Sequence, residues 1–242
     1  MTFTDPAAEM TMRSRVVSMV WGLLGFLAIS SAPQIRAEEA SLATACPLAA
    51  AWNDAHADQL PAAMKERDQR RTLSKPEVRK ELERRFDIDQ EARTAFLVHH
   101  QNGNEIGRID DDNERWLIGI LKESGWPTVD QIGEFGLHLM WLLVQHADRR
   151  VDLQKVVLPF FERMHTAGVF SSDDLARLSD RILVHEEKPQ RYGTQIDWSS
   201  SNFELRNIEN VEEVEANRAQ IGLMPLKDYG CMRSFELKQV TR

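Results

Sequence analysis

Apolar residues recur at helical spacing along most of the chain. Trp116, Leu117, Ile120 and Leu121 fall on one face of a helix, and the apolar run 135–144 is typical of a buried central helix. Cap residues and glycines then set the expected ends. The predicted helices run over 48–71 with a break near Pro61, over 76–86, from Asp87 or Asp89 to His100, from Asp111 to Gly125, from Thr128 through 144, from Asp152 to Gly168, from Ser171 or Ser172 through Ile182, and from Asn210 to Gly222.

The pattern changes after Pro189. Residues 192–198 and 203–208 alternate polar and apolar side chains, and the intervening residues 199–202 are Ser, Ser, Ser and Asn. Alternation on both sides of a polar turn predicts a β-hairpin. We therefore expect a mainly α fold, in which a single helical domain carries a small late β-hairpin (α+β).

The amino terminus has the features of a secretory signal. Arg13 and Arg15 precede the apolar run 16–29, and small residues lead to Ala37. The run has 14 residues, fewer than the roughly 20 that cross a bilayer, so an uncleaved anchor is the second interpretation. We expect an exported protein, periplasmic or secreted.

These features divide the chain into three parts. Residues 1–37 form the predicted signal peptide, residues 38–110 an amino-terminal helical region, and residues 111–242 a helical core with the hairpin and most of the polar motifs. Two cysteines, Cys46 and Cys231, follow the signal. Export permits a disulfide between them, and two free thiols are the alternative. Lipidation of Cys46 is disfavoured because Leu42 lies one position too far from it.

The charge of the chain limits the classes of binding partner that we expect. The net charge of −8 argues against a general nucleic-acid binder, which needs a basic face. The basic stretch 65–85 alternates the two signs of charge and is best read as a solvated helix face. We expect a small polar ligand or a protein as partner, and contact with a membrane only through an uncleaved anchor.

His146 is the first candidate for chemistry. It ends the most apolar run, and a histidine oriented by a carboxylate can act as a general base near neutral pH. Asp148 and Asp180 are the candidate catalytic partners. The alternative is a histidine that caps the helix end through a backbone carbonyl.

Polar residues beside apolar sequence supply the candidate ligand contacts. Arg181 could bind a carboxylate or phosphate through its planar fork, or it could form an ordinary ion pair. Gln145 shares a helix face with His138, seven residues earlier, and so forms either a polar stripe or two satisfied contacts. The run Tyr192-Gly193-Thr194-Gln195 is a candidate pocket edge, because glycine within a strand allows close approach.

No metal or cofactor is expected from the sequence. It has no His-Glu-x-x-His, no Cys-x-x-Cys and no calcium loop, and it lacks a Gly-x-Ser-x-Gly elbow, a P-loop and a dinucleotide fingerprint.

Several motifs follow one another from about Asp112 to Tyr229. They are Gly125-Trp126-Pro127, Gln145-His146-Ala147-Asp148, Gln154, Asp180-Arg181, Gln190, Tyr192-Gly193-Thr194-Gln195, Arg218, Gly222-Leu223, Pro225-Leu226 and Tyr229.

Together these motifs resemble the bacterial family called domain of unknown function 6624. Glu187 stands where the family pattern tends to place a glycine. The resemblance implies that the motif positions form one unit, and it adds Trp126, Gln190 and Arg218 as candidate ligand-binding residues. It implies no reaction.

Three functional hypotheses follow. The first is an exported hydrolase, with His146 as general base, Asp148 or Asp180 as its orienting partner, and Arg181 or Gln195 stabilising negative charge. The second is a non-catalytic binding module of the cell envelope for a polar ligand or a partner protein. The third is a purely structural network that docks the hairpin on the helices.

Overall fold

The computed structural model describes residues 41–99, 103–196 and 205–240. The predicted signal segment, 1–37, lies outside these residues. None of the helices in the described ranges is long and apolar enough to cross a membrane. The described α-helices, with a short 3-10 helix at Ala57–Gln59, are α1 (Leu42–Ala45), α2 (Pro47–Ala55), α3 (Pro61–Asp68), α4 (Pro76–His99), α5 (Asn104–Ser124), α6 (Val129–His146), α7 (Val151–Thr166), α8 (Ser172–His185), α9 (Val211–Gln220) and α10 (Leu226–Val240).

Local cap chemistry sets several of these boundaries. Thr128 and Gln131 form a reciprocal capping box at the start of α6. Ser171 caps α8 by accepting a hydrogen bond from the amide of Asp174, and Asn210 caps α9 in the same manner. The described residues are mainly helical, as predicted.

The predicted helix start at Asp111 was wrong, because α5 begins at Asn104. Three consecutive aspartates there pair with arginines instead of capping a helix. Arg93 lies 2.5 Å from Asp110, Arg149 lies 3.0 Å from Asp111, and Arg85 lies 2.8 Å from Asp112. The boundary drawn between 110 and 111 consequently falls inside a continuous helix.

Two further helices differ from the prediction. Residues 76–99 form one helix, α4, and not two, because Asp89 accepts hydrogen bonds within the helix interior and does not cap a new one. Helix α10 was missed. Its residues Leu226, Tyr229 and Met232 are buried in a small cluster, so tertiary packing stabilises a helix that has little amphipathic signal of its own.

The predicted β-hairpin is not supported. Among the described residues there is no strand, and one isolated antiparallel bridge joins Ile196 to Leu205. Residues 197–204, which hold the predicted turn, lie outside the described ranges. The backbone amides of Arg191, Tyr192 and Thr194 donate to the Asp180 carboxylate, so they are not available for a β-ladder.

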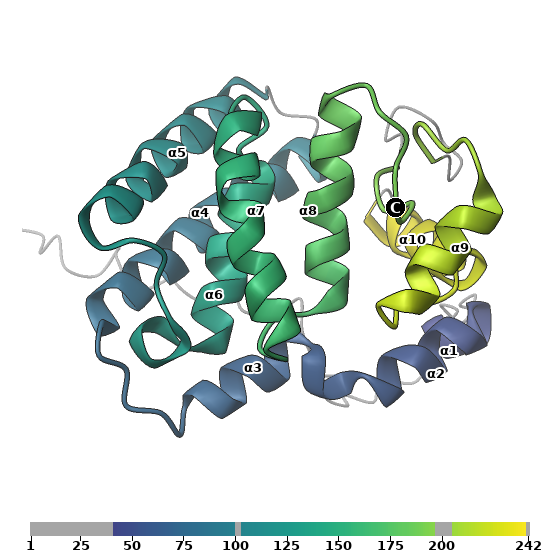
Figure 1. Cartoon of the computed structure of the whole chain (residues 1–242), viewed down its shortest axis with the longest axis horizontal. Coiled ribbons are helices and arrows are strands. Elements are labelled where there is room, and N and C mark those ends of the chain that lie inside the picture. The colour runs from purple at the N-terminus through teal and green to yellow at the C-terminus, as the bar shows by residue number, and fades with distance from the viewer. Residues whose placement is uncertain (1–40, 100–102, 197–204, 241–242) are drawn as a thin grey trace, which may run out of the picture. The chain divides into compact units, whose positions relative to one another are not determined.

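Helix α6 forms the centre of the main core. It packs against α3, α4, α5, α7 and α8 (Figure 1). Its buried side chains make it apolar on nearly all sides, as expected for a central helix. A smaller cluster joins α1 and α2 to α9 and α10, the purple and yellow helices that lie beside each other in Figure 1. A disulfide between Cys46 and Cys231 crosses this second cluster.

Helix α6 is kinked at Gly133, near its start. Gly133 has φ +80°, and a Cβ there would lie 2.2 Å from a carboxylate oxygen of Asp68. That carboxylate accepts the amide hydrogens of Glu134 at 2.9 Å and Phe135 at 3.0 Å, and it pairs with Arg79 at 2.6 Å. Asp68 thus caps the continuing part of α6 from another helix.

Candidate functional site

His146 forms a dyad with Asp89. The Nδ1 atom of His146 lies 2.9 Å from one carboxylate oxygen of Asp89 and 3.1 Å from the other. A carboxylate can only accept, so Nδ1 carries the hydrogen. Nε2 of His146 has no hydrogen-bond partner among the described residues, while the side chain remains 17% exposed. Burial lowers the pKa of His146, and Asp89 opposes that shift. The ring is therefore neutral near pH 7 with its Nε2 lone pair available.

Asp89 is held by donors on its own helix. Its side chain is 1% exposed and accepts from Arg93 Nε at 3.0 Å and Gln90 Nε2 at 2.8 Å. Burial alone would raise the pKa of Asp89, but His146 and Arg93 hold it below its ordinary value. The dyad carboxylate is thus ionised and fixed in place. This partner replaces Asp148 and Asp180, the two carboxylates that the sequence suggested.

Arg93 links the dyad to a further buried carboxyl group. Its other guanidinium nitrogen lies 2.5 Å from Asp110, whose side chain is 16% exposed. Burial raises the pKa of Asp110 to about 7, and the charges of Asp89 and Asp148 add to the shift. Asp110 therefore changes its protonation near neutral pH, one side chain away from the dyad.

Arg181 connects Asp148, which follows α6, with Gln195, which follows α8. Its fork binds both carboxylate oxygens of Asp148, at 2.5 and 2.7 Å, and it donates to Gln195 Oε1 at 3.3 Å. His185 Nε2 also lies 3.3 Å from Asp148. Burial alone would raise the pKa of Asp148, but Arg181 and His185 lower it below its ordinary value. Asp148 therefore holds Arg181 in position, and Arg181 in turn contacts the segment around Gln195.

A pocket of about 450 Å³ opens in front of His146. Residues from α4, α5, α6, α8 and α10 and from the segment 194–196 meet there. Among the described residues that line it are four arginines and no aspartate or glutamate, in a protein of net charge −8. We call it the arginine pocket. Its lining residues are Arg93, Phe96, Ile106, Trp141, Leu142, Gln145, His146, Arg177, Arg181, Thr194, Gln195, Ile196 and Arg233.

Gln145 lines the same pocket with an unsatisfied atom. The residue is 7% exposed, and its Oε1 has no hydrogen-bond partner among the described residues. A buried amide oxygen without a donor costs free energy, but this oxygen is enclosed by protein atoms and is closed to a ligand in this conformation. Of the two contacts considered for this helix face, that of His138 is satisfied by Asp174 at 2.8 Å, whereas Gln145 keeps an unpartnered oxygen.

Asp180 lies away from the pocket lining and is fully buried. Its carboxylate accepts the amides of Arg191, Tyr192 and Thr194 at 2.8 to 3.0 Å and the Thr194 hydroxyl at 2.8 Å. Burial raises its pKa, and the four donors oppose that shift. These four interactions attach the segment 191–194 to α8. Asp180 therefore supports the segment behind the pocket and does not line the pocket.

The remaining candidates divide between pocket and scaffold. Thr194 and Gln195 line the arginine pocket. Gln190 is buried and bonds the backbone of Gln195 at both of its amide atoms, which shapes the segment from behind. Tyr192 is buried against Ala176 and Leu223.

Arg218 and Trp126 also belong to the scaffold. Arg218 is 1% exposed, donates to the carbonyl oxygens of Tyr192 and Met224, and stacks over the Tyr229 ring. Trp126 packs in the main core against Phe160 and Phe161.

Several charged residues of the candidate site, Asp89, Arg93 and Arg177 among them, were missed from the sequence. Asp89 and Arg93 looked like the start of a helix, although their spacing of four places them on one face of a longer one. Arg177 lies four residues before Arg181 on α8, so the same spacing rule would have placed both arginines together. The spacing of four residues indicates a shared helix face, but it can be used only when the extent of each helix is known.

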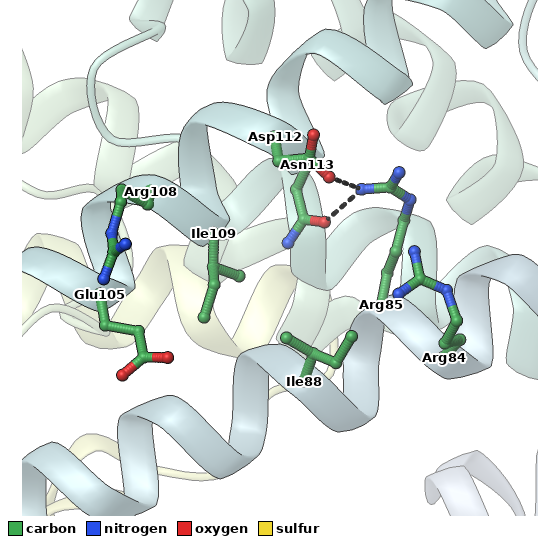
Figure 2. Close-up of a pocket in the computed structure, with 8 residues that line it drawn as sticks. All are labelled: Arg84, Arg85, Ile88, Glu105, Arg108, Ile109, Asp112 and Asn113. Carbon is green, nitrogen blue, oxygen red and sulfur yellow. Dashed lines mark hydrogen bonds and ion pairs between the residues drawn. The ribbon is translucent and has the colours of Figure 1, made fainter.

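A separate recess, which does not include His146, lies between α4 and α5 (Figure 2). There Arg85 donates to Asp112 at 2.8 Å and to Asn113 at 2.9 Å, with Ile88 and Ile109 beside them. Its described lining holds three arginines, two carboxylates and no histidine. It therefore lacks the dyad. In the described ranges, no group of three or more His, Cys, Asp or Glu side chains is arranged to hold a metal ion.

Comparison with known families adds one relationship. Residues 97–238 match the model described as "Family of unknown function (DUF6624)". The chain belongs to this family. The match confirms the predicted resemblance and extends it beyond both ends of the range 112–229. No curated protein and no solved structure matches the chain.

The family departure at Glu187 has a structural counterpart. Glu187 has φ +57°, in the left-handed region that favours glycine. It follows the cap of α8, where the amide of Lys188 bonds the carbonyl of Leu183 at 2.9 Å and the amide of Glu187 bonds that of Val184 at 3.1 Å. This is a Schellman motif, the usual setting for a glycine. The turn after α8 thus places a residue with a Cβ where glycine is favoured.

Proposed function

We propose that the arginine pocket binds a small anionic molecule and that His146 acts on it as a general base, activating water for hydrolysis. The dyad carries the proposal. With Nδ1 committed to Asp89, the second ring nitrogen of His146 is left to accept a proton, and Asp89 stabilises the imidazolium that forms.

The arginines support an anionic substrate. Arg181 is held by Asp148 and Arg177 by Asp173, so both guanidinium groups are oriented before a ligand arrives. Fixed cationic donors recognise carboxylate or phosphate oxygens, and they stabilise negative charge that develops during hydrolysis.

Water is the simplest nucleophile for this pocket. Its described lining contains no serine or cysteine, and the hydroxyl of Thr194 already donates to Asp180 at 2.8 Å. A covalent intermediate on a side chain therefore has no obvious carrier there. Direct attack by a water molecule that loses its proton to His146 fits the residues present.

The disulfide supports the proposed location. Cys46 and Cys231 are bonded, and disulfides persist mainly in oxidising compartments. Together with the predicted signal over residues 1–37, this bond favours a site of action outside the cytoplasm.

A panel of anionic chromogenic esters tests the reaction. The purified protein is assayed with p-nitrophenyl phosphate, bis(p-nitrophenyl) phosphate and mono-p-nitrophenyl succinate. We expect turnover of at least one, and a loss of about 10² to 10⁴-fold in kcat/KM for His146→Ala. His165→Ala is the matched control, because this ring bonds the carbonyl of Phe170 outside the arginine pocket and should keep wild-type turnover. Full activity of His146→Ala would overturn the role of general base.

Anion binding without turnover is the second candidate function. The oriented arginines favour it, since guanidinium groups held by Asp148 and Asp173 can bind an anion without any reaction. If inorganic phosphate or succinate binds and Arg181→Gln weakens it at least tenfold, while none of the esters is hydrolysed, the protein is a binding module.

A further inference from the structure

A second pocket adjoins the arginine pocket. It has a volume of about 380 Å³, and Trp141, Leu142 and Arg177 line both pockets. These three side chains stand between the two spaces, and Arg177 borders both of them. We call this second space the aromatic pocket.

Stacked rings form its walls. Trp52 of α2 and His56, which follows this helix, stack with their centroids 4.2 Å apart, and His138 stacks on Trp141 at 5.3 Å. The buried Tyr229 of α10 completes the aromatic lining. Flat apolar faces at the surface of a pocket are suited to a ligand with a ring.

Polar groups at the edges of the aromatic pocket differ from those of the arginine pocket. Its described lining includes three carboxylates, Asp173, Asp174 and Glu236, and one arginine. The amide side chains of Asn53 and Gln59 also line it. Carboxylates and amides accept hydrogen bonds from hydroxyl groups, so this edge suits a neutral, hydroxyl-bearing ring better than an anion.

His56 and His138 line the aromatic pocket, and His138 shares α6 with His146, but the imidazoles of His138 and His146 cannot act on one bond. His138 and His146 are eight residues apart on α6, which corresponds to about 12 Å along the helix axis. His138 is held by Asp174 at 2.8 Å. We therefore place His138 in ring binding and His146 in chemistry.

We infer that the two pockets bind one substrate, a saccharide that carries a phosphate or carboxylate group. The apolar face of the sugar would lie against Trp52, its hydroxyl groups would bond the carboxylates and amides, and its anionic group would reach Arg177, which borders both pockets. This inference rests on the proposed function, because it names the substrate class of the same site.

Binding measurements on the full protein test the inference. Isothermal titration compares inorganic phosphate, glucose 1-phosphate, glucose 6-phosphate, N-acetylglucosamine 6-phosphate and free glucose. We expect at least one sugar phosphate to bind tenfold or more tightly than phosphate. Trp52→Ala should remove this gain and leave the Kd for phosphate unchanged. Leu48→Ala is the control, since Leu48 lies on the same helix, is 67% exposed and does not line the pocket.

The outcomes separate this inference from the proposed function. If phosphate binds but no sugar phosphate binds more tightly, or if Trp52→Ala leaves the gain intact, the aromatic pocket is not a sugar site and the anionic site stands. If the sugar-dependent gain is present while no ester is hydrolysed, the substrate class stands as a ligand class and catalysis fails. Should Trp52→Ala lower the melting temperature strongly, Asn53→Ala serves as the second variant, and a preserved gain there overturns the inference.

Discussion

Asp89 on α4 lies 2.9 Å from the Nδ1 atom of His146 at the end of α6, although 57 residues separate them in the sequence. The packing of α4 against α6 makes this contact, and it decides which nitrogen of the imidazole is free. The dyad is thus a product of helix packing, and no local motif contains it.

Replacing Asp89 with Asn tests the dyad. The amide cannot stabilise an imidazolium, and burial remains, so the pKa of His146 should fall further below its ordinary value. Turnover of any ester hydrolysed by the wild type should drop about 10² to 10⁴-fold. NMR titration of the His146 ring measures the first effect. A pKa of His146 that is unchanged or higher in Asp89→Asn would show that the contact does not control the ring.

Asp180→Asn should act on stability. Three backbone amides and one hydroxyl lose a charged acceptor in a fully buried place, so we expect a loss of about 2–4 kcal/mol in the free energy of unfolding. Urea denaturation measures it. Asp54→Asn on α2 is the control, because Asp54 is exposed and should change stability by less than about 0.5 kcal/mol. A stable Asp180→Asn protein that loses ligand binding would instead place Asp180 in the site.

Gly133→Ala should destabilise the protein strongly. A Cβ at φ +80° would meet the Asp68 carboxylate at 2.2 Å, so we expect a loss of about 2–4 kcal/mol. The same substitution at Gly119, a helical position with no other heavy atom within 4 Å of the added carbon, should stabilise α5 by about 0.5–1 kcal/mol. Thermal unfolding of the two variants should therefore shift in opposite directions.

Glu187→Gly should stabilise the turn after α8. Glycine removes the Cβ that is unfavourable at φ +57°, and we expect a gain of about 0.5–1 kcal/mol. Glu187→Ala keeps a Cβ and should give no gain, which separates backbone strain from loss of the carboxylate. Equal stabilities of the two variants would argue against the strain.

Asp110 should give stability a specific pH dependence. Its pKa is about 7 in the folded protein and 3.8 in a model carboxyl group, so the folded state binds an extra proton between these values. The contribution of Asp110 to the free energy of unfolding should therefore fall as pH rises from about 4 to 7. His146, with its lowered pKa, contributes a slope of opposite sign. The difference between wild type and Asp110→Asn isolates Asp110, and melting temperatures at pH 5 and 8 measure it. An identical pH profile in the two proteins would contradict the raised pKa.

The predictable parts of this fold are those that depend on neighbours in sequence. The capping box of Thr128 and Gln131 and the caps at Ser171 and Asn210 were readable because a cap bonds residues two or three positions away. The central helix was readable because an apolar run of that length is costly to expose.

The parts that failed depend on distant partners. The aspartates 110–112 resemble a helix start until arginines from α4 and the segment after α6 are placed beside them. The alternation after residue 189 resembles a strand, but the carboxylate of Asp180 takes the amides that a ladder would use. Of the residues that line the arginine pocket, His146, Arg181 and Gln195 were named from the sequence, whereas Asp89, the carboxylate that contacts His146, was not.

The disulfide makes one covalent ring of almost the whole described fold. Cys46 precedes α2 and Cys231 lies in α10, 185 positions later, so the dyad and most of the residues that line the two pockets lie within the ring. The ring cannot close until residue 231 has been synthesised and α10 has reached α1 and α2. Formation of the disulfide is therefore a late step in folding. Once the bond has formed, cleavage of a single peptide bond within the ring opens the ring, but the disulfide still holds the two fragments together.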